Sequence, residues 1–446
     1  LHDSVAARND ESTPMDINAA WEAKRPALRL IFEAGRNNKR ELEFEHFKTT
    51  AGPDLDSFAT WCLCFEVWGA PWGENRWFFE KTIDDPAVRQ LVEEHHDLFE
   101  FNRWLQWIAA EQVNAAQQEA LDHGMTLGLM QDMAVGVHGL GADAWANPER
   151  FASGGVTVGC PPDFYNQQGQ DWGQPPFNPR YLEATGYQVY REMVHSRIDH
   201  VLGLFRLWWI PQGLGARNGA YVTYNHEAML GVLAIEATRA GGMVVGEDLG
   251  TVPDYVRRIL ADHGVLGTDV EWFNRVDDSP NAGDPYRAPK DYRKQALASV
   301  TTHDLPPTAG YLNFAHVKLR EELHLLSEPV EAFAASAMAE RTAMMNRLVE
   351  NGYISQTVAD DVEGHVQEIV EAMHAMLTDT PSLLLQAALV DGVGECRSQN
   401  QPGTSREYSN WRVPLADSSG HVVHTDEVFD LPRVQSLAAV MRREKR

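Results

Sequence analysis

The sequence predicts an α/β fold built on a parallel sheet or barrel. Short apolar runs alternate along the chain with segments of helical periodicity, an order typical of parallel strands joined by helices. Polar or acidic residues follow these runs. In a (β/α)8 barrel the functional groups lie where the strands end, so the same pattern indicates where a site is expected.

The first 124 residues are predicted to form a helical subdomain inserted in this fold. Apolar residues recur at helical spacing over 18–36 and over 86–123, and Gly124 supplies a stop. Between these helices, the Trp-rich stretch 61–79 contains glycines and a proline that break regular structure, and it is expected to be irregular.

Strands are expected at apolar runs farther along the chain. These runs are Met125–Met130, Val194–Ile198, Met243–Val245, Thr268–Phe273, Leu297–Thr302 and Leu383–Leu389. Helices are expected between them, for example over 226–240 and 254–263. The expected plan is therefore strands and site residues over 125–313, a helical insertion over 314–379, and a last strand with the C-terminal segment over 380–446.

The composition limits the classes of partner. The formal net charge is −26, so a basic surface that follows phosphates is not expected, and nucleic acid is a poor partner. No apolar run reaches the roughly 18 residues of a membrane helix, so no membrane partner is expected. The N-terminus has no signal pattern, which makes a cytoplasmic protein the default expectation. No glycine-rich dinucleotide motif follows a strand.

Three acidic residues, Asp199, Glu247 and Asp304, follow predicted strands. A lone acid at a strand end is usually a loop residue or a helix cap, but three of them suit the chemistry of a glycosidic bond. Cleavage with retention needs one carboxylate to attack the anomeric carbon and one carboxyl group to protonate the leaving oxygen. A third acid can hold sugar hydroxyls as the ring flattens, which favours the transition state.

Charged neighbours extend this pattern. Arg197 lies two residues before Asp199 and faces the same side of the strand, where a cation would keep the carboxylate ionised. A structural salt bridge is the alternative interpretation of Arg197, and both can hold at once. His200 and His303 flank acids and could bind sugar hydroxyls, although single histidines are more often structural.

The segment 159–173 is rich in turn-forming residues and is expected to be a loop. It combines aromatic rings with amides and a carboxylate, the side chains that bind sugar rings and their hydroxyls. Trp172 suits stacking on a sugar ring and pinning the loop about equally well.

Five stretches of the sequence carry distinctive motifs. They are Gly159–Asp163 with Gly169–Gly173, Ser196–His200 with Leu204–Gly213, Val245–Pro253, Thr301–Pro306, and Asn400–Thr404 with Glu407–Arg412. In this order they resemble the motifs of amylomaltases, the bacterial 4-alpha-glucanotransferases also called disproportionating enzymes. Each motif is moderately specific, and all five in order are highly specific.

The resemblance implies transfer of α-1,4-glucan segments between maltodextrins through a covalent sugar–enzyme intermediate. It implies that Asp199 is the nucleophile, Glu247 the acid and base, and Asp304 the group that stabilises the transition state. The side chains expected to contact the reacting sugar or to line neighbouring subsites are Arg197, His200, His303, Asp163, Gln170, Trp172 and Asn400. The family needs no organic cofactor and no catalytic metal.

The resemblance also implies a TIM barrel in which the three acids follow strands four, five and seven. Only one predicted strand, Met125–Met130, precedes the strand of Asp199 by this count, so the first two barrel strands are expected to be missing. The chain starts at Leu1 rather than Met, and we expect a fragment or a chain completed by an N-terminal segment. The open strand edges of an incomplete barrel would be costly, so activity of this stretch alone is a separate question.

Three other functions compete with transfer. An α-glucan hydrolase of the α-amylase type shares the barrel and the acids, and differs in using water to resolve the intermediate. A non-catalytic glucan-binding protein would tolerate loss of an acid, and none of the three is lost. A barrel enzyme with metal-assisted chemistry would need a His and Asp ligand set at strand ends, a pattern absent from this sequence.

Overall fold

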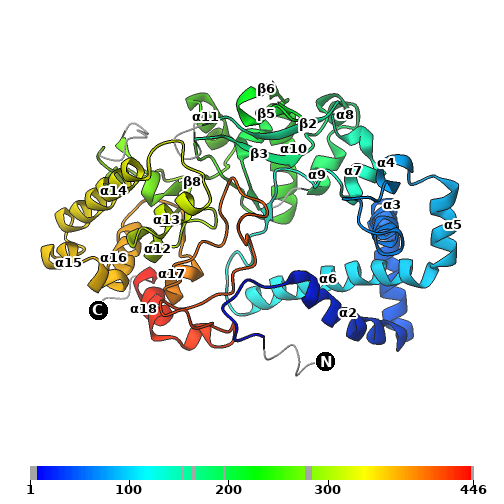
Figure 1. Cartoon of the computed structure of the whole chain (residues 1–446), viewed down its shortest axis with the longest axis horizontal. Helices are drawn as coiled ribbons and strands as arrows, with labels where there is room; N and C mark the ends of the chain where they lie inside the picture. Colours follow the sequence, from blue (N-terminus) through cyan, green and yellow to red (C-terminus); the bar gives the residue numbers. More distant parts are fainter. Residues whose placement is uncertain are drawn as a thin grey trace. The chain divides into compact units, whose positions relative to one another are not determined.

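The structure is a computed structural model that describes residues 8–152, 154–162, 167–193, 196–250, 252–276 and 284–442. Asp163, a predicted site residue, lies outside these ranges. The chain divides into two compact units (Figure 1). Unit 1 comprises Leu1–Ala20, Pro161–Gln170 and Val245–Arg446, and unit 2 comprises Trp21–Cys160 and Asp171–Val244. No helix within the described ranges is long and apolar enough to span a membrane.

The N-terminal helices, which lie mostly in unit 2, pack through aromatic side chains. They are α2 (Ile17–Glu33), α3 (Asn38–Trp68), α4 (Trp77–Glu80), α5 (Pro86–Glu94) and α6 (His96–Asp122). Phe44 of α3 stacks on Trp107 of α6 with ring centroids 5.2 Å apart, and both rings are buried. The helices predicted over 18–36 and 86–123 are confirmed, the second with a break at His95.

The expectation of irregular structure over 61–79 is wrong for its first part. Helix α3 continues to Trp68 and ends only at Gly69, whose φ of 92° is in the region that favours glycine. Leu63 of α3 is fully buried in a cluster that also contains Trp77. Trp61 and Trp68 of α3 therefore pack against this cluster, and the breakers act only from Gly69 to the start of α4 at Trp77.

A four-stranded sheet in unit 2 has the order β3-β2-β5-β6. Its strands are β3 (Gln170–Gln174), β2 (Val156–Cys160), β5 (Arg206–Pro211) and β6 (Ala220–Thr223). The pairs β2–β5 and β5–β6 are antiparallel, with Val158 opposite Trp209 and Trp208 opposite Tyr221. The loop expected over 159–173 is therefore wrong at both ends, because pairing within this sheet overrides the local turn-forming residues.

Short helices complete unit 2. They are α7 (Ala142–Ala146), α8 (Pro179–Ala184), α9 (Gln188–Met193) and α10 (His226–Ala240). The side chain of Asn225 caps α10 by accepting from the backbone N–H of Ala228, and Gly241 ends it in the left-handed conformation. The helix predicted over 226–240 is confirmed.

A two-strand parallel ladder in unit 2 carries the first candidate residues. Strand β1 (Asp132–Met133) pairs with β4 (Arg197–Ile198), with Asp132 opposite Arg197. The strand predicted at Met125–Met130 is wrong, because these residues form no ladder and their apolar side chains are largely exposed. Part of the strand predicted at Val194–Ile198 lies outside the described residues, and the rest contains β4.

Unit 1 is built on parallel strands. They are β7 (Val245–Gly246), β8 (Gly267–Val270), β9 (Ala296–Ser299) and β10 (Leu384–Gln386). The pairs β8–β9 and β9–β10 are parallel, and Val245 of β7 forms a parallel bridge to Leu266, the residue before β8. Each strand overlaps one of the last four predicted runs. Because helices alternate with these parallel strands, the α/β fold class is confirmed.

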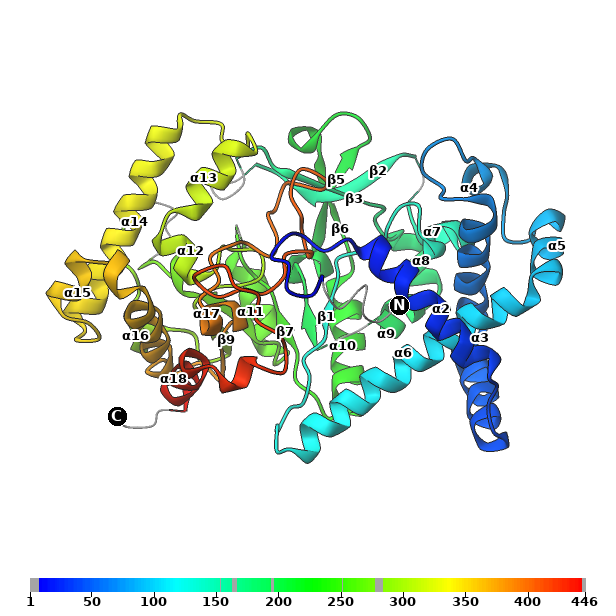
Figure 2. The same ribbon diagram turned by 60° about the horizontal axis from the view of Figure 1, so that its bottom comes forward.

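Helices cover the sheet of unit 1 and contain most of its core. They are α11 (Asp254–Asp262), α12 (Thr308–Leu312), α13 (Ala315–Glu322), α14 (Val330–Glu350), α15 (Gln356–Asp360), α16 (Val366–Thr378), α17 (Leu389–Val393) and α18 (Pro432–Met441). Figures 1 and 2 show α12, α14 and α16 grouped together, and fully buried residues such as Met344 and Met373 join them. Met344, Met345, Met373 and Met376 therefore fill the core, as expected from the helical spacing of the methionines, whereas Met338 is exposed.

Two helical glycines give a matched test of this packing. In α12 a Cβ at Gly310 would overlap the backbone carbonyl oxygen of Cys396, whereas in α10 a Cβ at Gly231 meets no non-neighbouring atom within 4 Å. We expect Gly310→Ala to lower the free energy of unfolding by about 1–3 kcal/mol, because the backbones must move apart. We expect Gly231→Ala to raise it by up to about 1 kcal/mol, because alanine is the better helix former.

Urea unfolding of both variants measures these changes. Equal stability of Gly310→Ala and the parent chain would contradict the close approach of α12 to Cys396.

Candidate active site

Asp199 lies at the carboxyl end of β4 in unit 2. Its backbone N–H donates to the carbonyl oxygen of Met133, 3.1 Å away, which continues the β1–β4 ladder. Its side chain is 37% exposed, and its Oδ1 lies 3.7 Å from Nη1 of the nearly buried Arg197. The cation expected beside this carboxylate is therefore in place, while the carboxylate stays accessible to solvent.

Arg197 also pairs with a second acid that was not among the predicted site residues. Its Nη1 donates to Oδ2 of Asp132 on the neighbouring strand β1. This contact is closer than the one to Asp199, so Asp132 sets the position of the guanidinium. The signal for Asp132 was present, because it follows an apolar run as the other acids do, but the pairing depends on strand register.

His200 follows Asp199 in the left-handed conformation, with a φ of 49°. Its ring packs edge-on against Trp172 of β3, with centroids 5.3 Å apart. Burial lowers the pKa of His200 to about 4, and the positive charge of Arg206 adds to this effect. His200 is therefore a neutral hydrogen-bonding group at neutral pH, not a cation.

Glu247 and Asp248 follow β7 in unit 1 and have opposite surroundings. Asp248 is buried; it accepts from the backbone N–H of Thr268 and pairs with the guanidinium of Arg293. Glu247 is only half-buried, and its Oε1 accepts from the backbone N–H of Leu249 at 2.6 Å. Asp248 therefore stabilises the fold, whereas Glu247 remains partly accessible to solvent.

Asp304 follows β9 in unit 1 and is held by two predicted site residues. Asn400 Nδ2 donates to Asp304 Oδ1 at 2.7 Å, and His303 Nε2 lies 3.2 Å from Asp304 Oδ2. The Asp304 side chain is 42% exposed. Glu247 and Asp304 both lie beyond the carboxyl ends of parallel strands, the edge where functional groups of such sheets collect.

Trp411 is an aromatic neighbour that the site prediction missed. Its ring centroid lies 5.2 Å from that of His303, and the side chain is exposed. Its φ of 61° is unusual for a bulky residue, and a backbone hydrogen bond to Gln399 holds it. The C-terminal motif Glu407–Arg412 contains Trp411, so the signal was there, but not the contact with His303.

The segment 159–173 supplies two further predicted residues that the structure describes, Gln170 and Trp172. Both belong to β3, and Gln170 is half-buried. Earlier in the segment, Gln167 is anchored in unit 1. Its Nε2 donates to Glu328 at 2.8 Å and its Oε1 accepts from the backbone N–H of Ser327 at 3.0 Å.

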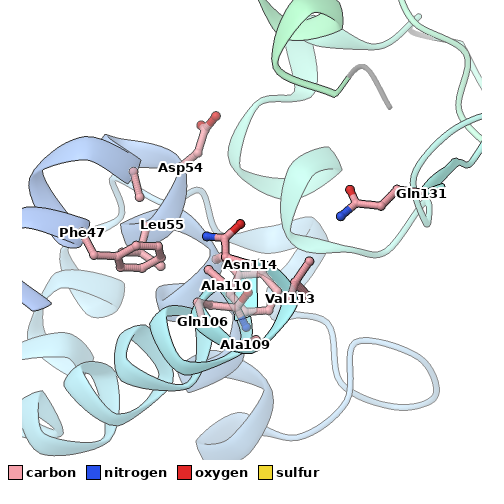
Figure 3. Close-up of a pocket in the computed structure, with 11 residues that line it drawn as sticks. Phe47, Asp54, Leu55, Gln106, Ala109, Ala110, Val113, Asn114 and Gln131 are labelled. Carbon is pink, nitrogen blue, oxygen red and sulfur yellow. The ribbon is translucent and has the colours of Figure 1, made fainter. Parts of the chain in front are cut away.

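A separate hollow of about 620 Å³ lies in unit 2, between α3 and α6 (Figure 3). Its lining is Phe47, Ala51, Asp54, Leu55, Phe58, Gln106, Ala109, Ala110, Val113, Asn114 and Gln131. None of these is a predicted site residue. Within the described part of the chain, no group of three or more His, Cys, Asp or Glu side chains is placed to hold a metal ion.

The sequence matches a family model described as 4-alpha-glucanotransferase over residues 1–419. The 4-alpha-glucanotransferase of Mycobacterium tuberculosis strain H37Rv is 47% identical over 453 residues, which covers 99% of this chain and 61% of that protein. The 4-alpha-glucanotransferase of Haemophilus influenzae is 33% identical over 340 residues, 74% of this chain and 48% of that protein. The chain thus spans less than two thirds of the length of these relatives.

Two solved structures resemble the fold. The amylomaltase from Corynebacterium glutamicum superimposes with a TM-score of 0.86 at 38% identity, covering 98% of this chain and 61% of that one. The amylomaltase from Streptococcus agalactiae, solved in complex with acarbose, gives a TM-score of 0.69 at 18% identity and covers 96% and 79% of the two chains. The second likeness concerns the fold alone.

The surroundings of His200 predict its titration. Its pKa of about 4 lies below the ordinary 6.5, so between these values the unfolded chain binds more protons than the folded one. We therefore expect the free energy of unfolding of the parent chain to decrease relative to that of His200→Gln as the pH falls from 6.5 toward 4. NMR of imidazole-labelled protein, assigned with this variant, measures the pKa directly.

His424 is an internal control, because its hydrogen bond to Asp10 raises its pKa. An ordinary pKa near 6.5 for His200 would contradict its burial.

Proposed function

The chain belongs to the 4-alpha-glucanotransferase family, and on this premise we propose that the protein transfers α-1,4-glucan segments between maltodextrins. The transfer retains the anomeric configuration and passes through a covalent sugar–enzyme intermediate. Maltodextrins and other α-1,4-glucans are both donors and acceptors. Since the chain spans only part of its relatives, this activity is proposed for the polypeptide that carries it.

The arrangement around Asp199 carries the proposal. An accessible carboxylate at a strand end lies 3.7 Å from an arginine that a second acid holds in place. A nucleophile must be ionised and reachable, and both needs are met here without burying an unpaired charge. A merely structural ion pair would not need Asp199 to stay 37% exposed, because Asp132 already satisfies Arg197.

The other two acids suit complementary roles. Glu247 is half-buried and accepts a backbone hydrogen bond from Leu249, which orients it, and we assign it the exchange of a proton with the sugar oxygen. Asp304 is oriented by Asn400 and His303 and stays accessible, so it can accept hydrogen bonds from sugar hydroxyls. The exposed ring of Trp411 beside His303 offers an apolar face to a sugar.

The proposed reaction has two displacements. In the first, an Asp199 oxygen forms a bond to the anomeric carbon while the glycosidic bond breaks, and Glu247 gives its proton to the leaving oxygen. In the second, a hydroxyl of an acceptor glucan loses its proton to Glu247 and attacks the same carbon, which releases Asp199. The flattened, positively charged ring of each transition state is held by Asp304 through its hydroxyls.

We propose that the parallel strands belong to one (β/α)8 barrel whose carboxyl ends bring the three acids to one rim. Retention then requires the carboxyl groups of Asp199 and Glu247 to lie about 5–5.5 Å apart. A wider separation, of about 6.5–9.5 Å, would suit inversion by water instead. The other substrate contacts proposed are Arg197, His200, His303, Asp163, Gln170, Trp172 and Asn400, the same set that the motifs imply.

We expect the polypeptide to convert maltotriose into glucose and a ladder of longer oligosaccharides. Transfer to a sugar hydroxyl lengthens chains, whereas transfer to water only shortens them. Chromatography of the products after incubation with maltotriose distinguishes the two. Shortened products alone would identify a hydrolase, and glycogen binding without any product would identify a binding protein.

Replacement of the acids by their amides gives a second test. We expect Asp199→Asn to lower kcat by roughly 10⁴-fold or more, because the amide is not a nucleophile. We expect Glu247→Gln to lower it by about 10²–10⁴-fold, because the proton transfer is lost. Asp262→Asn, at an exposed acid of α11, is the matched control and should keep full activity.

Circular dichroism and thermal unfolding of the three variants check that the fold is unchanged. Near-normal turnover by Asp199→Asn would remove that residue from the mechanism.

A further inference from the structure

Two buried acids of unit 1, Asp391 of α17 and Glu395 just beyond it, have no place in the proposed reaction. Each is only 2% exposed. Burying a carboxylate is costly unless donors surround it, so the partners of these two side chains show what they stabilise. Asp391 and Glu395 hold the two segments whose side chains meet in the Asn400–Asp304 hydrogen bond.

Asp391 holds the helix that follows Asp304. Its Oδ1 accepts from the backbone N–H of Thr308 at 2.7 Å, and its Oδ2 accepts from the Thr308 hydroxyl at 2.7 Å. Thr308 is the first residue of α12, so Asp391 satisfies one of the N–H groups that a helix start leaves without an internal partner. The start of α12 is thereby fixed four residues after Asp304.

A side-chain hydrogen bond within the turn itself holds the start of the segment that carries Asp304. Thr301, two residues after the buried end of β9, donates from its hydroxyl to the carbonyl oxygen of Pro306 at 2.9 Å. The turn that carries Asp304 is thus held by Thr301 at its base and by Asp391, through Thr308, at its exit. The position of α12 decides where the turn ends.

His374 of α16 supports Asp391 from the core. Its Nε2 lies 3.8 Å from Asp391 Oδ2, and both side chains are fully buried. Its Nδ1 lies 2.8 Å from the carbonyl oxygen of Val370, an arrangement in which Nδ1 donates. Burial raises the pKa of Asp391, and both His374 and the donors of Thr308 oppose that rise.

Glu395 holds the segment that carries Asn400. Its Oε1 accepts from the backbone N–H groups of Cys396 and Arg397 at 3.0 and 2.9 Å. Its Oε2 accepts from the backbone N–H of Ala416 at 3.0 Å and from the Arg397 guanidinium at 2.8 Å. One carboxylate therefore ties together both ends of the C-terminal loop in which Asn400 lies.

The two anchored segments also touch directly, because Gly310 of α12 packs against the carbonyl of Cys396. We propose that Asp391 and Glu395 are positioning residues: Asp391 sets the Asp304 turn through Thr308, and Glu395 sets the Asn400 loop. Together they fix the distance and direction of the Asn400–Asp304 hydrogen bond. The catalytic consequence rests on the proposed function, whereas the hydrogen bond itself can be tested without turnover.

The first test observes the Asn400 side-chain amide by ¹⁵N NMR, assigned with Asn400→Ala. We expect Asp391→Asn and Glu395→Gln each to shift or broaden this signal, because the donor no longer meets Asp304. Asp269→Asn is the matched control, since Asp269 is also a buried acid of unit 1 but pairs with Arg293. We expect Asp269→Asn to lose stability and to keep the Asn400 signal. An unchanged Asn400 signal in folded Asp391→Asn and Glu395→Gln would overturn the proposal.

The second test measures turnover on maltotriose. If Asp391 acts through Asp304, we expect Asp391→Asn to lower kcat by roughly 10²-fold with little change in KM, as for a small misplacement of a transition-state group. The same substitution in an Asp304→Asn background should add little, because the group being positioned is already lost. Additive losses would overturn the proposal.

A milder pair covers the case in which Asp391→Asn does not fold. Thr308→Val removes one of the two donors to Asp391 and Thr308→Ser keeps both. We expect the Asn400 signal to move in the first and to stay in the second; the same response in both would count against the proposal. If the Asn400 signal moves in these variants although the parent chain shows no transfer activity, that result would support the positioning roles of Asp391 and Glu395 and would refute only the proposed function.

Discussion

A carboxylate that is buried away from water must accept hydrogen bonds or pair with a cation. The buried acids of unit 1 meet this requirement by bonding to groups on other segments of the chain. Asp248 and Asp269 share Arg293 between neighbouring strands, and each also accepts a backbone N–H group. Asp391 receives both donors of Thr308 at a helix start. Each buried acid therefore joins two segments that the apolar core alone would not hold in register.

The candidate catalytic acids differ from these in their exposure to solvent. Asp199 and Asp304 keep more than a third of their side chains in contact with solvent, and each has neighbours that orient it without enclosing it. Glu247 directly precedes the buried Asp248 and is itself only half-buried. β7 is thus followed by one acid that stabilises the fold and one to which we assign a role in the proposed reaction.

Local sequence signals predicted what depends on local structure. The helix over 226–240 and the acids after the parallel strands follow from periodicity and from apolar runs, and both were found. The pairing of Arg197 with Asp132 could not be predicted, because it depends on the register of strands 65 residues apart. The run Met125–Met130 was misread because an apolar run forms a strand only where another strand pairs with it.

In the proposed reaction Asp199 becomes covalently bonded to the sugar. A fluorinated α-glucosyl fluoride tests this directly, because the ring fluorine slows both steps while the fluoride leaving group restores the first, so the ester accumulates. Proteolysis and mass spectrometry then locate the added sugar. We expect a single labelled peptide with the sugar on Asp199. A label on another acid, or turnover to an inverted product without any ester, would contradict it.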